Sequence, residues 1–106
     1  MGAPPQLTLE ERRAALAKAA QSRKTRALFK SEVKSGDRHW LDAFKSDDEA
    51  IKKMRVKELL ESLPGFGEIR AMNILERAGI SVSRRVQGVG RSQYETLLRL
   101  LKEVDR

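Results

Sequence analysis

The residues best suited to chemistry lie in two glycine-containing turns near the C-terminus of the chain. The first turn, Leu63-Pro64-Gly65-Phe66-Gly67, stands between two short helical segments and is followed by Arg70. Two glycines allow left-handed backbone and the close approach of another backbone. The amides of Gly65 and Gly67 can point at one phosphate, and a helix starting at Glu68 adds its positive N-terminal end. The alternative for such a hairpin is a purely structural connector.

The second turn repeats this arrangement of glycines before a helix. Two arginines and two glycines precede a helix that we expect to begin at Arg91, and the turn with the start of this helix comprises Ser83, Arg84, Arg85, Gln87, Gly88, Gly90, Arg91 and Gln93. Guanidinium groups suit phosphates or a narrow minor groove. The pattern alone is a weak signal, but its position one short helix after the first turn strengthens it. The two turns predict backbone contacts to double-stranded nucleic acid.

The charge of the chain favours the same partner. In 106 residues, 22 Lys and Arg stand against 15 acids, which gives a net charge of +7 and a pI of about 10.1. Each phosphate that a protein neutralises releases a counterion, so a basic surface favours polyanions. A basic surface without a partner and an acidic membrane are the alternatives. The length fits one small domain.

Several classes of site are excluded by composition. The chain has no cysteine and a single histidine, His39, so we expect no disulfide, metal site or cofactor. The nearest acid–base candidates are Asp42, Asp47, Asp48 and Glu49, which crowd into one solvated stretch without a histidine or metal partner. They indicate acidic helix starts rather than catalysis, so we expect no enzyme. No apolar run approaches the roughly 18 residues of a membrane span. The N-terminus lacks the features of a secretory signal. We therefore expect a cytoplasmic protein without membrane association.

A long N-terminal helix is predicted over residues 9–34. Thr8 and Glu11 form a capping box before it, and Ser35-Gly36-Asp37 ends it. Its first half contains mostly alanine, lysine and arginine, so we expect it to project from the core. At 100° per residue a basic face spans an arc of about 80°, formed by Arg12, Arg23, Arg26, Lys30 and Lys34. This face is either solvated or a second binding surface.

The remaining chain reads as short helices, so the fold class is all-α. We divide the chain into residues 1–35, the tail and long basic helix, and residues 36–106, a small helical domain. Asp37 is expected to cap a short helix with Trp40 and Phe44, and Gly79 to end the helix of residues 68–77. The last helix is expected over residues 91–104. The expected core residues include Leu28, Phe29, Val33, Ile51, Met54, Leu59, Leu60, Leu63, Ile69, Met72, Leu75, Tyr94, Leu97, Leu98, Leu101 and Val104.

With these segments the sequence resembles the actinobacterial integration host factor family. The resemblance covers nearly the whole chain and rests on its Pro-Gln-Leu-Thr start, the Arg-Ala-Ala-Leu-Ala-Lys-Ala-Ala segment, Lys53-Met54-Arg55-Val56, Leu59-Leu60-Glu61-Ser62-Leu63-Pro64 and Arg84-Arg85-Val86-Gln87-Gly88-Val89-Gly90. It implies a helix-two-turns-helix (H2TH) fold, also found in ribosomal protein S13. It also implies double-stranded DNA binding with little sequence preference, DNA bending or compaction in the nucleoid, and assistance to a phage integrase.

Two positions depart from the pattern of that family. Gln87 replaces a usual arginine, and Glu68 stands where lysine is common. Both replacements lower the local positive charge, although Glu68 suits a helix N-terminus. We therefore expect binding to depend more on Arg91 and on the basic face of the long helix.

The resulting hypothesis is a monomeric architectural DNA-binding protein. The first turn and residues 83–91 hold neighbouring phosphates, Pro64 wedges beside a base step, and the long helix contacts more backbone or a second duplex. The nearest alternative is an S13-like RNA-binding protein of the ribosome. A protein-recruitment module using the last helix is less suitable, because the small core needs those apolar side chains.

Overall fold

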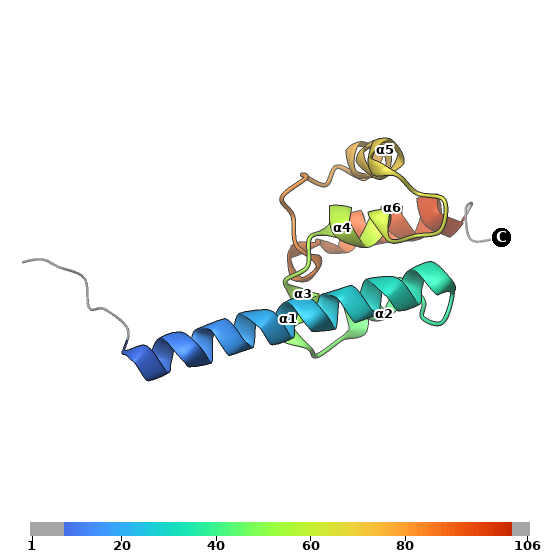
Figure 1. Ribbon diagram of the computed structural model, residues 1–106. Helices are drawn as coiled ribbons and strands as arrows, with labels where there is room; N and C mark the ends of the chain where they lie inside the picture. Colours follow the sequence, from blue (N-terminus) through green and yellow to red (C-terminus); the bar gives the residue numbers. More distant parts are fainter. Residues whose placement is uncertain (1–7, 103–106) are drawn as a thin grey trace, which may run out of the picture.

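The structure, a computed structural model, describes residues 8–102 and confirms an all-helical fold in which one long helix precedes a smaller helical domain (Figure 1). The elements of the described residues are α1 (Leu9–Ser35), α2 (Asp42–Lys45), α3 (Glu49–Lys52), α4 (Val56–Glu61), α5 (Glu68–Ala78), the 3₁₀ turn η1 (Val86–Gly88) and α6 (Arg91–Lys102). The expected end of the last helix at Val104 lies outside these residues.

Helix α1 begins at the predicted capping box. The Glu11 amide donates to Thr8 Oγ1 at 3.0 Å, and the Thr8 amide donates to Glu11 Oε1 at 3.2 Å. The helix ends at Gly36, whose φ of 88° places it in the left-handed region. Every residue from 8 to 21 is exposed, and this half projects from the domain as expected (Figure 1).

The second half of α1 packs into the common core. Phe29 and Val33, one helical turn apart, are 2% and 3% exposed and belong to one cluster with residues of α3, α4, α5 and α6. The prediction that Leu28 is buried was wrong, because it is 63% exposed. It precedes Phe29 by one residue and therefore points about 100° away from the buried face.

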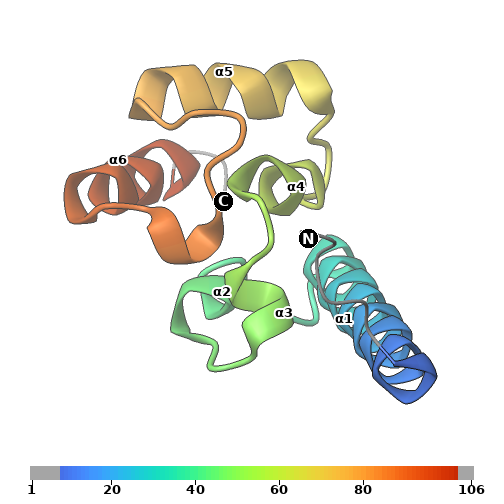
Figure 2. The same cartoon turned by 90° about the vertical axis from the view of Figure 1, so that its left-hand side faces the viewer.

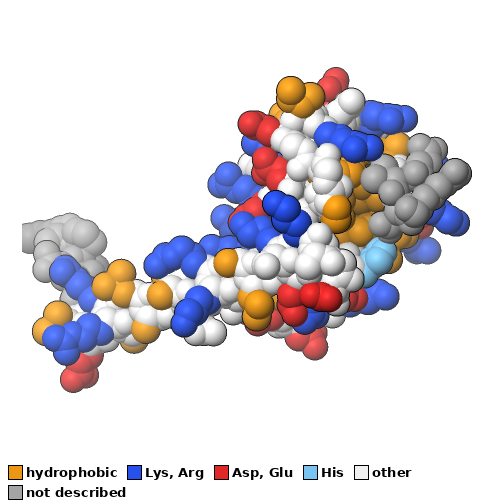
Figure 3. Space-filling view, turned by 45° about the vertical axis from the view of Figure 1, so that its right-hand side comes forward, with side chains coloured by type: hydrophobic (Ala, Val, Ile, Leu, Met, Phe, Trp, Pro, Cys, Tyr) orange, Lys and Arg blue, Asp and Glu red, His pale blue; other side chains and the backbone are white. Residues whose placement is uncertain are grey.

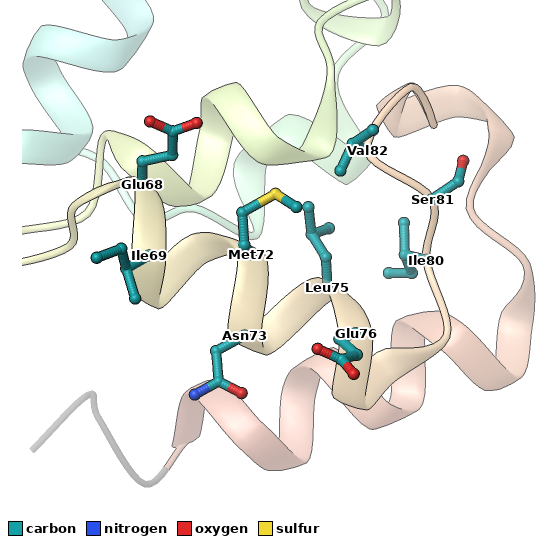
Figure 4. Close-up of a pocket in the computed structure, with 9 residues that line it drawn as sticks. All are labelled: Glu68, Ile69, Met72, Asn73, Leu75, Glu76, Ile80, Ser81 and Val82. Carbon is teal, nitrogen blue, oxygen red and sulfur yellow. The ribbon is translucent and has the colours of Figure 1, made fainter.

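Of the three predicted core residues of helix α5, only Leu75 is buried, at 1% exposure. Ile69 is 86% exposed and Met72 is 38% exposed, whereas the buried residues are Ala71, Ile74, Leu75 and Ala78. The small Ala71 and Ala78 share this face with the larger Ile74 and Leu75, and the helix packs against α4 and α6. Ile69 and Met72 instead line an apolar hollow of about 660 Å³ between α5 and the following segment, with Ile80 and Val82 on its other side (Figure 4).

The short helices after α1 also differ in detail from the prediction. Asp37 does not cap a helix: its carboxylate accepts a hydrogen bond from Ser35 Oγ at 2.8 Å, and α2 begins after Leu41. The acidic start of α3 is confirmed, because Asp48 Oδ1 accepts from the Ala50 amide at 2.9 Å. Residues 53–55 then connect α3 to α4.

Candidate nucleic-acid interface

The first turn connects α4 to α5 and is held by its own backbone. The Leu63 amide donates to Leu60 O at 3.1 Å, and the Phe66 amide donates to Leu63 O at 3.0 Å. Gly65 has a φ of 79°, a left-handed conformation that favours glycine. The Phe66 side chain is buried in the core, and the Arg70 guanidinium lies 4.6 Å from its ring centroid. Phe66 thus anchors the turn, while Pro64 is exposed at its surface.

The N-terminal end of α5 is left open. Within residues 8–102, no hydrogen bond is donated by the amides of Gly65, Gly67, Glu68, Ile69 and Arg70. Gly67 is the N-cap of this 11-residue helix and supplies no side chain to its first turn. A Cβ atom built on Gly67 meets nothing within 4 Å. These free amides and the helix dipole together can hold an anion such as a phosphate.

The second turn is attached to the start of α4. The Val86 amide donates to Met54 O at 2.8 Å, and the Val56 amide donates to Arg84 O at 3.0 Å. These bonds form an isolated antiparallel bridge between Arg55 and Arg85, while Val86 is buried. The core therefore fixes the position of the turn and leaves its polar side chains outside.

The two arginines of the second turn have different surroundings. Arg84 Nη1 donates to Gly88 O at 3.2 Å, and a Cβ atom on Gly88 would lie 3.2 Å from Arg84 Cδ. Glycine at this position therefore gives the Arg84 side chain room to lie across the turn. Arg85 Nη1 donates to Lys53 O at 2.9 Å, which directs this guanidinium toward the segment before α4. Gln87 is exposed.

Gln93 braces the turn that leads into α6. Its Oε1 accepts from the Gly90 amide at 3.0 Å, and its Nε2 donates to Gly79 O at 2.8 Å. The Gly90 amide and the Gln93 side chain, both predicted to contact DNA, thus bond within the protein. Arg91 remains 92% exposed and lies 3.4 Å from Glu95 Oε1. Because a fully exposed ion pair is weak, this guanidinium is available to an anion.

The two turns lie at opposite ends of α4. The first turn follows Glu61, and the second pairs with the chain just before Val56 (Figure 1). Since α4 has 6 residues, about 9 Å of helix separates the two positions. The turns thus offer two separate anion contacts instead of one joint pocket.

The predicted basic face of α1 is only partly free. Arg12, Arg23 and Lys34 are exposed, whereas Arg26 and Lys30 are half-buried. Lys30 Nζ lies 2.6 Å from Glu58 Oε1 of α4, so this charge is compensated within the fold. Figure 3 shows Lys and Arg side chains along the projecting helix. The projecting half and the second turn lie on the same side of the molecule, which faces the viewer in Figure 2.

Sequence reasoning missed two basic residues of this side. Lys53 and Arg55 lie beside Arg85 in the structure. The available signal was the concentration of bases around the buried Met54, since Lys52, Lys53, Arg55 and Lys57 fall within six consecutive positions.

The described residues hold neither a cluster of metal ligands nor a helix suited to a membrane. No group of three or more His, Cys, Asp or Glu side chains among residues 8–102 is placed to hold a metal ion. No helix in the described part of the chain has the length and apolar character to cross a membrane.

Comparison with known proteins places this geometry in a family. Residues 41–101 match the S13-like H2TH domain. The chain is 48% identical over 101 residues to an integration host factor of Streptomyces coelicolor, covering 93% of this chain and 94% of the relative. It is 42% identical over 96 residues to the integration host factor of Mycobacterium tuberculosis, covering 89% and 91%.

A solved structure is similar along most of its length. The structure of sIHF bound to an 8 bp palindromic DNA superposes with a TM-score of 0.76 at 44% identity, covering 79% of this chain and 97% of the other. Three predictions agree with these relatives: the family, the all-helical fold class and a protein that is not an enzyme. The chain therefore belongs to the actinobacterial integration host factor family and carries its S13-like H2TH domain.

Proposed function

We propose that this protein binds double-stranded DNA through its two turns with little dependence on base sequence, and that it bends or compacts DNA in the nucleoid. The observation that carries the proposal is the open N-terminal end of α5. There the amides of Gly65 and of residues 67–70 have no hydrogen-bond acceptor among residues 8–102. A relative with 44% identity has been solved with an 8 bp DNA, which supports the choice of ligand.

The first turn binds one backbone phosphate in this proposal. The amides at Gly67 and the start of α5 donate to the phosphate oxygens, and the helix dipole favours the negative charge. The bare Cα atoms of Gly65 and Gly67 leave space for the approach. Main-chain amides contact phosphates without reading base edges, so the contact fixes position and carries no sequence preference.

The second turn binds the backbone at a separate point. Arg84 lies across Gly88, and Arg91 is exposed at the start of α6. Guanidinium groups make charge-assisted hydrogen bonds to phosphate oxygens. Contacts at both ends of α4 then set the orientation of the protein on the duplex.

Bending and compaction follow from two further features. Pro64 is an exposed apolar residue beside the open amides, and it can wedge at a base step when the turn is pressed against DNA. The exposed bases of α1, notably Arg23 and Lys34, offer a second surface for the same or another duplex. A phage integrase acting on bent DNA is the protein partner that the family resemblance implies.

Fluorescence anisotropy with labelled nucleic acids tests this function. Duplex DNA of several sequences, duplex RNA and single-stranded DNA are titrated at several salt concentrations. The test variant is Arg84→Ala/Arg91→Ala, and Arg99→Ala at the far end of α6 is the matched control. We expect similar affinity for all DNA duplexes and a salt slope lower by about two in the double variant only. Equal slopes for both variants would contradict the proposal.

The S13-like match gives one alternative ligand. Because residues 41–101 match an S13-like domain, the same open amides suit the phosphates of A-form RNA. In the same titration, tighter binding of duplex RNA than of duplex DNA would favour this alternative. Weak binding to every nucleic acid would reject both.

A further inference from the structure

A basic hollow lies where α1 meets the start of α4 and the second turn. It encloses about 300 Å³ and is lined by Arg26, Lys53, Met54, Arg55, Glu58 and Arg85. These residues come from α1, from the segment before α4, from α4 itself and from the second turn. Four of the six lining side chains carry a positive charge, so the hollow gathers cations from parts of the chain far apart in sequence.

The single carboxylate in the lining does not balance these charges. Glu58 Oε1 already lies 2.6 Å from Lys30 Nζ, and both side chains are about two-thirds buried, with 35% and 33% exposure. Among the described residues, none of the four cations lies within 4.0 Å of a carboxylate oxygen. Within residues 8–102 the Arg85 guanidinium donates one hydrogen bond, to Lys53 O. The hollow thus has an uncompensated positive charge.

The backbone places two of these arginines directly opposite one another. The bonds from Val86 to Met54 O and from Val56 to Arg84 O make Arg55 and Arg85 a non-hydrogen-bonded pair of an antiparallel bridge. In such a pair the Cα atoms approach most closely, to about 4.5 Å. Like charges directly opposite one another are destabilising. A fold that holds two arginines in this way without a carboxylate is suited to an anion from outside.

We infer that this hollow is a phosphate-binding site, and that a backbone phosphate of DNA fills it and fixes α1 against the second turn. The statement that this phosphate belongs to DNA rests on the proposed function. The ability of the hollow to bind a phosphate group does not depend on it. The size is adequate, because about 300 Å³ is roughly ten times the volume of one water in the liquid, about 30 Å³. Arginine forks and the Lys53 ammonium supply donors for all the phosphate oxygens.

The position of the site gives it a mechanical role. Arg26 belongs to α1, and Lys30, one turn further along, already joins α1 to α4 through Glu58. A phosphate bridging Arg26 to Arg55 and Arg85 adds a second tie on the same side. The projecting basic half of α1 then takes a fixed direction relative to the DNA held by the second turn. Free pyrophosphate carries the same chemistry and competes for the site.

Nuclear magnetic resonance of the guanidinium Nε–Hε groups tests the assignment with two probes, sodium pyrophosphate and a short DNA duplex. The parent is compared with Lys53→Gln/Arg55→Gln and with Lys52→Gln, a control whose ammonium pairs with Glu49 outside the hollow. A thermal melt of each protein checks folding. We expect pyrophosphate to shift the Arg26, Arg55 and Arg85 signals of the parent and of the control. In the double variant we expect the Arg26 and Arg85 shifts to be lost.

The salt dependence of duplex binding then shows whether the phosphate in the hollow comes from DNA or from a free phosphate compound. We expect the double variant to lower the salt slope by about one or two and the control to leave it unchanged. One outcome would overturn the phosphate site and leave the proposed function standing. In this outcome the parent binds duplex DNA, but no arginine signal responds to pyrophosphate and the salt slopes of the parent and the double variant are equal. If pyrophosphate shifts the three signals but the parent does not bind duplex DNA, the phosphate site stands and the proposed function fails.

Discussion

Replacing Gly67 with serine should stabilise the protein and weaken its binding to DNA. Gly67 is the N-cap of α5, with φ −102° and ψ −173°, an extended conformation that serine adopts without strain. A Cβ atom there meets nothing within 4 Å. The serine hydroxyl can therefore accept a hydrogen bond from an amide two or three residues later, which is the usual function of an N-cap residue.

The two effects of Gly67→Ser differ in sign and size. Serine is a better N-cap than glycine by a few tenths of a kcal/mol, so the free energy of unfolding should rise by about that amount. The hydroxyl occupies an amide that the phosphate needs. Losing one hydrogen bond to a charged group costs about 1.5 to 3 kcal/mol. Since 1.4 kcal/mol is a factor of ten, duplex affinity should fall roughly tenfold to a hundredfold.

Urea unfolding followed by circular dichroism and anisotropy with duplex DNA measure the two quantities on the same samples. Gly67→Ala serves as the matched control, because it adds the Cβ atom without a hydroxyl and should weaken binding less. A serine variant that binds duplex DNA as tightly as the parent would refute the role of the α5 amides. A variant that loses binding together with stability would indicate misfolding instead of competition for the amide.

Three further predictions concern other parts of the interface. Gly88→Ala brings a Cβ atom to 3.2 Å from Arg84 Cδ, so we expect the Arg84 side chain to be displaced. The affinity for duplex DNA should then fall by about threefold to tenfold at low salt, because a single exposed phosphate contact is worth about 1 kcal/mol. Anisotropy titrations equal to those of the parent would contradict this prediction. Pro64→Ala should reduce the DNA bend angle at saturation, measured by energy transfer between the duplex ends, and an unchanged angle would reject the wedge. Arg23→Glu/Lys34→Glu should abolish compaction of long DNA in single-molecule extension while short duplexes still bind, and compaction equal to that of the parent would reject the second surface.

Local sequence rules predicted most of the helical framework. The capping box of Thr8 and Glu11 and the left-handed glycine after α5 depend on residues close in sequence, and both were confirmed. In α5 the burial of Leu75 was predicted correctly, but Ile69 and Met72 are not buried, because the contact also uses alanines such as Ala71, which is fully buried. Hydrophobic periodicity gives the larger Ile69 and Met72 more weight, although only the neighbouring helices decide which face is covered.

Of the proposed interface, only the two turns were predictable from the sequence. The glycines of both turns are visible in sequence, but the partners of Gln93 and Arg85 are not. Gln93 reaches Gly79, fourteen residues away, and Arg85 faces Arg55 across thirty residues. Such contacts arise from tertiary pairing, which has no local pattern. The basic hollow could therefore be found only after the second turn was placed beside the start of α4.

The most direct test of the central claim is to map the DNA contacts on the protein by amide nuclear magnetic resonance with a short duplex. We expect the largest shifts on Gly65, Gly67 and the first residues of α5, and on residues 84–91 of the second turn. The same pattern should appear with an unrelated duplex sequence. Shifts confined to α1, with both turns unchanged at saturation, would contradict the proposed function.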